Sequence, residues 1–449
     1  MSEPTTETIC AVATAAGRAG VGVVRLSGPA SRTIAERLTG IDPRPRYAHY
    51  VRLRRVADDS VLDDGIVLFF PGPHSYTGED VIEWQGHGNP VLLDEAVREM
   101  VHAGARMARP GEFTERAFLN GRMDLAQAEA VADLIEAGSA QAANAARRSL
   151  TGAFSRRIDT FVDHLIHLRM YIEAALDFPE EEIDFLSDTR LRDQLESLRA
   201  ELNDLLARTG EGVRLREGMQ LVIVGRPNAG KSSLLNQLAG ESRAIVTEIA
   251  GTTRDVLRAE IDLDGLPLHV IDTAGLRESE DPIEQEGIRR AWAEIERADL
   301  ILLLIDGTQG RTAEDDETLA QLPDKPLLTV TNKIDLTGEA ASETAEDGRL
   351  RLSARTGAGL DALRTELRRV AGLAEATENP FIARRRHLDA LEQARDQLEE
   401  AAQALIGLGA GELAAENLRR AQESMEVITG RFTADDLLGE IFGSFCIGK

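Results

Sequence analysis

The segment Gly225–Ser232 combines residue types that bind phosphate groups. It follows the apolar run Leu221–Val224 and fits the pattern G-x-x-x-x-G-K-[ST], and the apolar spacing after it becomes helical. Glycines let backbone N–H groups converge on phosphate oxygens, while Lys231 adds a positive charge and Ser232 offers a hydroxyl to Mg²⁺. The pattern therefore predicts a strand, a phosphate-binding loop and a helix rather than an ordinary glycine-rich turn. The predicted phosphate contacts are Asn228, Ala229, Gly230, Lys231, Ser232 and Ser233.

A second group of motifs selects the base. Asn332-Lys333-Ile334-Asp335 follows an apolar run, and the Asp335 carboxylate can accept hydrogen bonds from N1–H and the N2 amino group of guanine, which adenine lacks. Asp272-Thr273-Ala274-Gly275 and Ser353-Ala354 also follow predicted strands. Together with the phosphate-binding loop and Asn332–Asp335, these make four motifs in order over about 130 residues, which is typical of a GTP hydrolase. The predicted contacts from these motifs are Asp272, Thr273, Ala274, Gly275, Asn332, Lys333, Asp335, Ser353, Ala354 and Arg355.

Composition limits the class of protein. The 449 residues are 43% hydrophobic, which favours about three globular domains, and no apolar run approaches the length of a membrane span. Two cysteines, Cys10 and Cys446, exclude a disulfide framework and a four-cysteine zinc site. The N-terminus lacks the features of a signal or transit peptide, so we expect a cytoplasmic protein without a membrane partner.

The formal net charge of -26 argues against non-specific binding to nucleic acid, so an RNA partner needs a local basic patch. Each candidate group also fits an ordinary solvated face. The candidates are Arg44, Arg46, Arg52, Arg54 and Arg55, then Arg147, Arg148, Arg156 and Arg157, and finally Arg384, Arg385 and Arg386.

Lysine is rare in this chain. Of the 51 basic residues only Lys231, Lys325, Lys333 and Lys449 are lysines. A lysine retained in such a sequence indicates a place where a compact ammonium is needed, although Lys449 also fits a solvated chain end.

Periodicity predicts a multidomain protein of α+β and α/β parts. Residues 1–118 alternate strands with two helices, 119–216 are helical, 217–375 hold the nucleotide motifs, and 376–449 are helical again. We therefore predict a GTPase domain inserted into a discontinuous helical domain whose two halves pack together. The strands predicted in the first part are Thr8–Ala13, Val21–Leu26, Tyr47–Leu53, Gly65–Phe70 and Val81–Trp84, and the helices are Ala30–Leu38 and Pro90–His102.

Four sequence segments give the chain a family resemblance that covers essentially its whole length. They are GRPNAGKSSLLN (Gly225–Asn236), IAGTTRD (Ile249–Asp255), DTAGLRE (Asp272–Glu278) and the C-terminal FCIGK (Phe445–Lys449). These segments resemble the MnmE (TrmE) family of tRNA modification GTPases. The resemblance implies an N-terminal folate-binding domain that forms a homodimer, an interrupted helical domain and a potassium-stimulated Ras-like GTPase.

The resemblance also implies a reaction. Together with an FAD-dependent flavoprotein of the MnmG (GidA) type in a heterotetramer, such a protein uses 5-formyl- or 5,10-methylene-tetrahydrofolate to modify tRNA. The product is 5-carboxymethylaminomethyluridine, or the aminomethyl form, at the wobble position. By motif, Arg25, Glu83 and Lys449 match the folate-binding residues, and Arg122 stands where the family normally has lysine.

Hydrolysis needs groups that the usual motifs do not supply here. Leu276 stands where many GTPases have a water-orienting glutamine, and by resemblance Glu284 orients the water through a second water. An exposed glutamate at a helix start is the alternative for Glu284. We assign catalytic roles to Glu284, Lys231 and Asn228.

No arginine finger is evident, so we expect a K⁺ ion to supply the missing positive charge. Its predicted ligands are Asn228, Thr247, Ile249 and Thr252, and Thr253 resembles the residue that completes Mg²⁺ coordination with Ser232. Ordering of this loop requires a second GTPase domain. The predicted nucleotide contacts in the loop are Thr247, Glu248, Ile249, Ala250, Gly251, Thr252 and Thr253.

Two other classes compete with this interpretation. A ribosome-assembly GTPase of the Era or Der type shares Asn228 and the DTAGL pattern, but it needs a KH-like RNA module where this sequence predicts helices. A membrane-remodelling switch needs a basic amphipathic helix or a lipid anchor, and the sequence offers neither.

Overall fold

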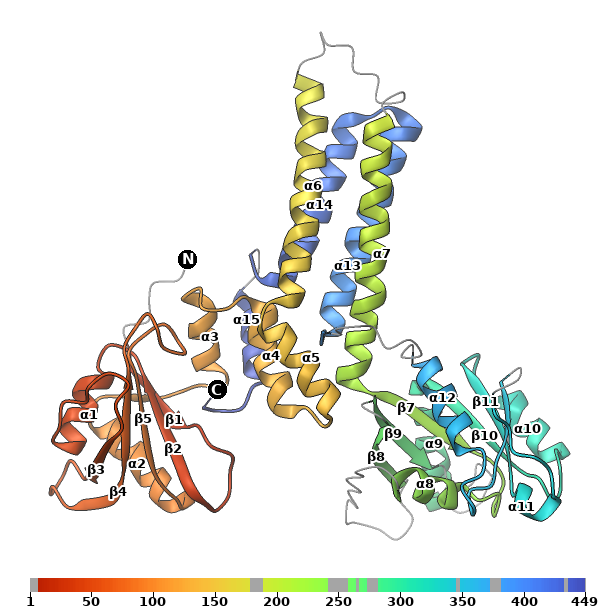
Figure 1. Cartoon of the computed structure of the whole chain (residues 1–449), viewed down its shortest axis with the longest axis horizontal. Coiled ribbons are helices and arrows are strands. Elements are labelled where there is room, and N and C mark those ends of the chain that lie inside the picture. Colours follow the sequence, from red (N-terminus) through yellow and green to blue (C-terminus); the bar gives the residue numbers. More distant parts are fainter. Residues whose placement is uncertain are drawn as a thin grey trace. The chain divides into compact units, whose positions relative to one another are not determined.

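The computed structural model describes residues 7–177, 189–240, 257–263, 266–272, 282–344, 348–371, 381–431 and 435–448. The chain divides into two compact units (Figure 1). The first unit comprises Met1–Ala132, Ile158–Val162 and Gln422–Lys449, and the second comprises Asp133–Arg157 and Asp163–Ala421. The boundaries of the four predicted segments stay predictions.

The first unit is built on a six-stranded sheet of order β3-β4-β5-β2-β1-β6, antiparallel except for the β1–β6 pair. Its elements are β1 (Ile9–Val12), β2 (Ala19–Ser27), α1 (Ser31–Thr39), β3 (His49–Arg54), β4 (Val61–Phe70), β5 (Val81–Gly88), α2 (Pro90–His102), β6 (Arg106–Met107), α3 (Glu112–Leu119), most of α4 (Leu125–Glu136), the end of α14 (Gly411–Thr429) and α15 (Asp435–Gly443).

The two faces of this sheet have different roles. Val24, Leu26 and Trp84 are buried beneath α1 and α2 on one face (Figure 1). Because side chains alternate along a strand, Arg25 and its cross-strand partner Glu83 lie on the other face. The strand register therefore brings together two residues that are distant in sequence.

Each strand and helix predicted in the first 118 residues is present, with ends shifted by a few residues. Two elements were not predicted. Strand β6 is only two residues long, too short for a periodic pattern. Helix α3 begins at Glu112, seven residues before the predicted start of helical structure at Leu119, because Phe113 and Ala117 are buried there.

The second unit holds a six-stranded sheet of order β12-β11-β10-β7-β9-β8, parallel except for the β8–β9 pair. Its elements are α5 (Ala140–Leu150), α6 (Ala153–Asp177), α7 (Thr189–Glu217), β7 (Met219–Val224), α8 (Lys231–Gly240), β8 (Leu257–Leu263), β9 (Leu266–Asp272), α9 (Pro282–Arg297), β10 (Leu300–Asp306), α10 (Ala313–Gln321), β11 (Leu327–Asn332), α11 (Ile334–Thr337), β12 (Arg349–Arg351), α12 (Leu360–Val370), α13 (Arg385–Ala402), a π-helical turn (Gln403–Gly407) and the start of α14.

Strand β7 is buried on both faces, as is typical of a parallel sheet covered by helices. Leu221 and Ile223 pack in one core with residues of α8 and α12, and Val222 and Val224 pack in a second core with Ile295 of α9. The unbroken apolar run before the phosphate-binding loop thus reflects a central strand.

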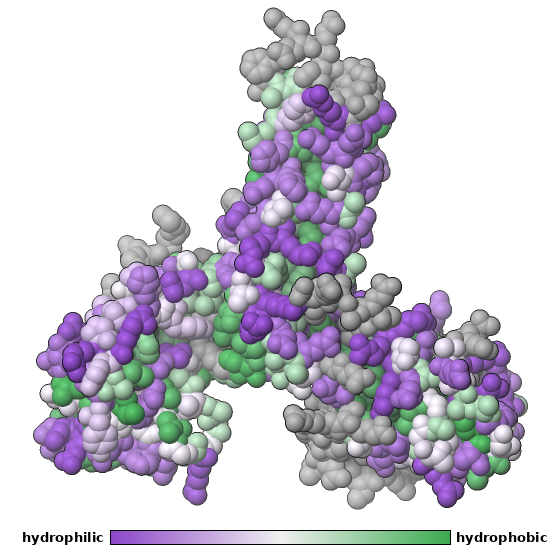
Figure 2. Space-filling model, in the orientation of Figure 1, coloured by the Kyte–Doolittle hydropathy of each residue, from purple (hydrophilic) through white to green (hydrophobic). Residues whose placement is uncertain are grey.

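The two predicted helical halves contact each other. Helix α7 packs against α13 from the second half, with an ion pair between Arg199 and Glu399 and with buried Leu198 and Leu398. Hydrophilic side chains cover most of the visible surface of α6 and α7 (Figure 2). In the described part of the chain, no helix combines the length and apolar character needed to cross a bilayer.

The two connections between the helical part and the nucleotide part lie close together. Asp133, only 4% exposed, accepts hydrogen bonds from Arg216 Nε at 2.8 Å, before β7, and from Arg384 Nη2 at 2.9 Å, before α13. Buried Ser149 exchanges hydrogen bonds with both the N–H and the C=O of Ile382. This proximity confirms the predicted insertion.

Candidate functional site

The phosphate-binding loop connects β7 to α8, as predicted. Gly225 has φ 150°, and a Cβ there would lie 2.4 Å from Leu304 O. Gly230 has φ 101°, and a Cβ there would lie 2.3 Å from Asn332 Nδ2. Both conformation and space therefore require glycine at these two positions.

The polar side chains of this loop lie at its exposed side. Lys231 Nζ donates to Gly225 O at 2.7 Å and to Arg226 O at 3.2 Å, so the ammonium lies over the loop. Asn228 is exposed and has φ 64°, a left-handed conformation that asparagine tolerates. Ser232 and Ser233 are exposed in the first turn of α8.

Asn332 connects the predicted phosphate and base regions. Its side chain is buried, donates from Nδ2 to Ala229 O at 2.9 Å and accepts at Oδ1 from Ala354 N at 2.8 Å. Both ends of the amide are thus bound to backbone. We conclude that this predicted nucleotide-binding residue positions the two loops.

Asp335 is oriented by its neighbours. Ser353 Oγ donates to Asp335 Oδ1 at 2.7 Å, and Arg355, 81% exposed, places Nη1 3.8 Å from Oδ2. The structure therefore brings the predicted guanine-binding carboxylate together with the Ser353-Ala354 motif.

Asp306, at the end of β10, was not predicted from the sequence. Lys333, with φ 67°, places Nζ 2.6 Å from Asp306 Oδ2. Burial alone would raise the pKa of Asp306, but hydrogen bonds from Lys333 and Thr308 outweigh burial and hold this pKa below its ordinary value. The sequence signal was a carboxylate directly after the apolar run Leu300–Ile305.

Part of the predicted nucleotide site lies outside the described residues. This is true of the loop Thr247–Thr253, with its predicted K⁺ and Mg²⁺ ligands, and of Thr273–Gly275. Asp272 and Glu284 are described only by their backbone, at the end of β9 and in the first turn of α9.

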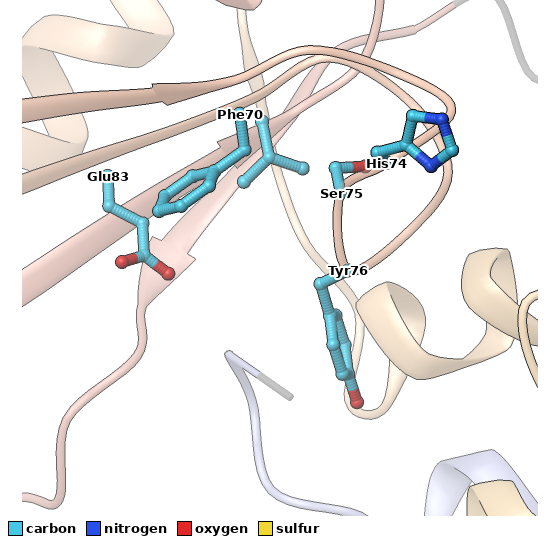
Figure 3. A pocket seen from close by; sticks show the side chains of 6 residues that line it. Phe70, His74, Ser75, Tyr76 and Glu83 are labelled. Atoms are coloured by element: carbon cyan, nitrogen blue, oxygen red, sulfur yellow. The ribbon is translucent and has the colours of Figure 1, made fainter. Parts of the chain in front are cut away.

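A cavity of about 250 Å³ opens in the first unit, lined by Phe70, His74, Ser75, Tyr76, Val81 and Glu83. The carboxylate of Glu83 and the ring of Tyr76 point toward the same space (Figure 3). Arg25 donates to Glu83 Oε1 from Nε at 3.0 Å and from Nη2 at 2.8 Å, and its guanidinium carbon lies 5.3 Å from the Tyr76 ring centroid. The cavity therefore combines a cation, a carboxylate and aromatic walls.

Arg25 and Glu83 were predicted together as binding residues, whereas Phe70 and Tyr76 were not predicted. Tyr76 lies in a loop (residues 72–80) that is unusually rich in polar residues. This composition was the sequence feature that could have identified the loop as part of a binding site.

Buried ion pairs hold this loop against the sheet. Glu79 accepts from Ser27 Oγ at 2.7 Å and from Arg116 Nη1 at 3.0 Å, and Arg116 also pairs with Glu112. Glu112 is 1% exposed and pairs with Arg106 at 2.7 Å. Burial opposes ionisation of Glu112, but hydrogen bonds from Arg106, Arg109 N and Arg116 prevail and lower its pKa to about 2.

The C-terminal tail, which belongs to the first unit, lies against Gly111 and the end of β1. The C=O of Cys446 accepts from Gly111 N at 3.4 Å, and a Cβ at Gly448 would lie 2.1 Å from Val12 O, so the tail backbone contacts the end of β1. Lys449 lies outside the described residues. Arg122 is exposed, and its side chain lies beside Gly78 of the loop 72–80.

The two cysteines differ in environment. Cys446 is exposed. Cys10 is fully buried, and burial raises its pKa to about 11. Cys10 therefore stays a neutral thiol at neutral pH.

Comparison with known proteins gives two family matches. Residues 8–122 match the family model of the GTP-binding protein TrmE N-terminus, and residues 125–446 match that of the MnmE helical domain. The tRNA modification GTPase MnmE of Marinobacter nauticus is 55% identical and covers 100% of both chains. The protein of the same description from Chromohalobacter salexigens is 58% identical over 99% of this chain and 98% of its own.

A weaker likeness is found among solved structures. Aquifex aeolicus Era bound to GDP and aluminium fluoride is 24% identical, with a TM-score of 0.29, and the match covers 47% of this chain and 89% of Era. A likeness of this size does not support the competing Era-type interpretation. Because the sequence relatives match over nearly the whole chain, the protein belongs to the MnmE (TrmE) family of tRNA modification GTPases.

Proposed function

We propose that the cavity of the first unit binds 5-formyl- or 5,10-methylene-tetrahydrofolate and that the chain uses this one-carbon unit to modify the wobble uridine of tRNA. The product is 5-carboxymethylaminomethyluridine or the aminomethyl form. The observation that carries the proposal is the pair Arg25 and Glu83 beside Tyr76 and Phe70.

The chemistry of these side chains fits a folate. The pterin ring is flat, which suits aromatic walls, and it carries the same N–H donors as guanine, which suit the carboxylate of Glu83. Arg25 holds Glu83 in place for the pterin, and the carboxylates of the glutamate tail of folate suit the cation Arg122. Lys449 follows Gly448, whose backbone contacts β1, and we propose that its ammonium adds a further cation. When bound, the folate supplies the one-carbon unit.

We propose that the nucleotide site binds GTP together with two cations. Ser232, exposed at the start of α8, would bind Mg²⁺ together with Thr253. Asn228, exposed on the phosphate-binding loop, offers an amide oxygen to K⁺, with Thr247, Ile249 and Thr252 as further ligands. Lys231 binds the phosphates, and Glu284 positions the attacking water. The remaining proposed GTP contacts are Ala229, Gly230, Ser233, Glu248, Ala250, Gly251, Asp272, Thr273, Ala274, Gly275, Asn332, Lys333, Asp335, Ser353, Ala354 and Arg355.

The proposed assembly is a homodimer that joins an FAD-dependent flavoprotein of the MnmG (GidA) type in a heterotetramer. The flavoprotein would supply the redox chemistry, because neither cysteine of this chain has a partner thiol. Transfer RNA is the shared substrate.

Calorimetric titration of the full-length protein with 5-formyltetrahydrofolate tests the proposal. We expect one site per chain, and we expect Glu83→Gln to lower its affinity by about tenfold or more, because an amide cannot accept from two N–H donors in the same way. Glu95→Gln is the matched control, since Glu95 lies in the same unit and pairs with Arg55 away from the cavity.

Absence of binding by the wild-type protein would contradict the folate assignment. Equal losses in Glu83→Gln and Glu95→Gln would indicate a general effect of charge, and the cavity would then not be the site.

A further inference from the structure

The structure separates the three candidate basic groups of the sequence. In the first group, Arg52, Arg54 and Arg55 pair with Asp64, Asp59 and Glu95. In the third group, Arg384 pairs with Asp133 and Arg385 with Asp389. Most of these arginines are therefore neutralised by a carboxylate.

The second group is also a poor candidate for an RNA-binding surface. Arg157 pairs with Asp204, and Arg156 donates to Thr151 O. Arg147 and Arg148 lie on α5, and neither has an aromatic ring partner among the described residues.

Arg44 and Arg46 differ from the others. Both are exposed, and neither forms an ion pair with a described residue. The guanidinium carbon of Arg44 lies 4.0 Å from the centroid of the Tyr47 ring, and this ring contacts His49 edge to face at 4.8 Å. His49 Nε2 in turn accepts from Arg44 N at 2.9 Å. These contacts pre-organise a small cationic and aromatic surface, which we name the 44–49 corner.

The 44–49 corner lies at the rim of the cavity. Arg46 Nη2 donates to His74 O at 2.5 Å, and its guanidinium carbon lies 5.9 Å from the Phe70 ring centroid. His74 and Phe70 both line the cavity. Arg46 also has φ 56°, and its N–H donates to Phe69 O at 2.8 Å, so the chain is held in a turn that presents these side chains.

We propose that the 44–49 corner binds the single-stranded part of the RNA substrate, with Arg44 and Arg46 on phosphates and an unstacked base against Tyr47 and Arg44. Proteins that read single-stranded RNA combine arginines with aromatic rings in this way. In a chain of net charge -26, arginines without an ion-pair partner among the described residues lower the repulsion that an RNA backbone meets beside the cavity. The inference rests on the proposed function, because it places the uridine next to the one-carbon donor.

Binding of a fluorescein-labelled RNA anticodon stem–loop, with uridine at the wobble position, tests this by fluorescence anisotropy at several salt concentrations. Arg44→Ala and Arg46→Ala should each weaken binding and make the slope of log K against log salt less negative by about 1. Tyr47→Leu should weaken binding roughly tenfold with little change in that slope. The matched control is Arg52→Ala, which removes the same charge from the same unit but is already paired with Asp64. It should change affinity by roughly twofold or less.

Titration with 5-formyltetrahydrofolate separates this inference from the proposed function. Arg44→Ala and Tyr47→Leu should keep the folate affinity of the wild type, which shows that the first unit is folded. If the wild type binds no folate but RNA binding still depends on Arg44 and Arg46, the RNA surface stands and the folate assignment fails.

Two results would overturn the inference. One is wild-type RNA affinity in both arginine variants, and the other is an equal loss of RNA affinity in Arg52→Ala. If RNA affinity is unchanged but the variants lose binding to the purified flavoprotein, the 44–49 corner is a protein interface.

Discussion

The nucleotide-binding loops and the cavity of the first unit are held in place by different forces. The loops around Asn332 are joined by hydrogen bonds between a buried neutral amide and backbone groups of Ala229 and Ala354. The loop that borders the cavity is held by buried ion pairs that run from Glu79 through Arg116 to Glu112. Hydrogen bonds between an amide and backbone groups do not depend on pH, because none of these groups titrates. A buried ion pair, in contrast, is stable only while its carboxylate is ionised. Variants in the nucleotide region should therefore alter nucleotide chemistry, and variants of the buried ion pairs beside the cavity should alter folding.

The largest expected effect is on the chemical step of the nucleotide region. Glu284→Ala should slow single-turnover GTP hydrolysis by about 10²–10⁴-fold with GTP affinity unchanged, because a water-positioning group is lost. Glu296→Ala, on the exposed side of the same helix, is the control. Similar rates of GTP hydrolysis in the two variants would show that Glu284 is a solvated residue at the start of the helix with no catalytic role.

Exchange of K⁺ for Na⁺ at constant ionic strength tests the cation in the same region. We expect hydrolysis to fall on the order of 10²-fold, as when one preorganised charge-stabilising group is removed. Asn228→Ala should hydrolyse GTP at similar rates in both salts while it keeps its nucleotide affinity. Equal wild-type rates in the two salts would exclude the K⁺ site.

In the cavity region, Glu112→Gln should lower the free energy of unfolding by about 3 kcal/mol at pH 7, because it leaves Arg106 and Arg116 without their buried partner. The pKa of Glu112 is lowered to about 2 in the folded protein, so its stabilisation is full above its ordinary pKa near 4.5 and is lost as the pH falls toward 2. The difference between wild type and variant should therefore shrink on acidification.

Urea unfolding followed by Trp84 fluorescence measures this difference. The chain has two tryptophans, so a Trp292→Phe background makes Trp84 the reporter of the first unit. Glu115→Gln is the control, since Glu115 pairs with the exposed Arg109 and should contribute under about 1 kcal/mol. A difference that stayed constant from pH 7 to pH 3 would refute the ionic account of this loop.

The smallest expected effect concerns base selection. Asp335→Asn should lower GTP affinity by about one to two powers of ten and admit xanthosine triphosphate, because an amide donates where the carboxylate accepted. Asp361→Asn, whose side chain is 99% exposed, is the control. Unchanged GTP affinity in Asp335→Asn would show that another group reads the base.

These regions also differ in how far the sequence predicted them. Gly225, Lys231 and Asp335 belong to short contiguous motifs, because a loop that binds phosphate through its backbone is specified locally. The cavity depends on strand register, which places Arg25 opposite Glu83 across 58 positions of sequence. The family resemblance named both residues, but nothing in the local pattern showed that Phe70 and Tyr76 would complete the walls.

Helix α3 and the ion pairs around Glu112 were not predicted for a related reason. A charged residue is normally read as solvated, and only the tertiary structure shows that Glu112 and Arg116 bury each other. The insertion of the nucleotide part was predicted from the helical segments on both sides of it, whereas the role of Asp133 in joining its two connections required the structure.

The central claim is that the cavity around Glu83 supplies the carbon that enters the wobble uridine. Its most direct test uses the protein with its flavoprotein partner, GTP, K⁺, tRNA, ¹³C-labelled methylene-tetrahydrofolate and either glycine or ammonium to supply the nitrogen of the product, followed by mass spectrometry of the digested tRNA. At a folate concentration below the wild-type Kd, the account predicts a ¹³C-labelled modified uridine with the wild type and at most about a tenth as much with Glu83→Gln, while both hydrolyse GTP at similar rates. An unlabelled product from the wild type, or equal labelling with Glu83→Gln, would contradict the account.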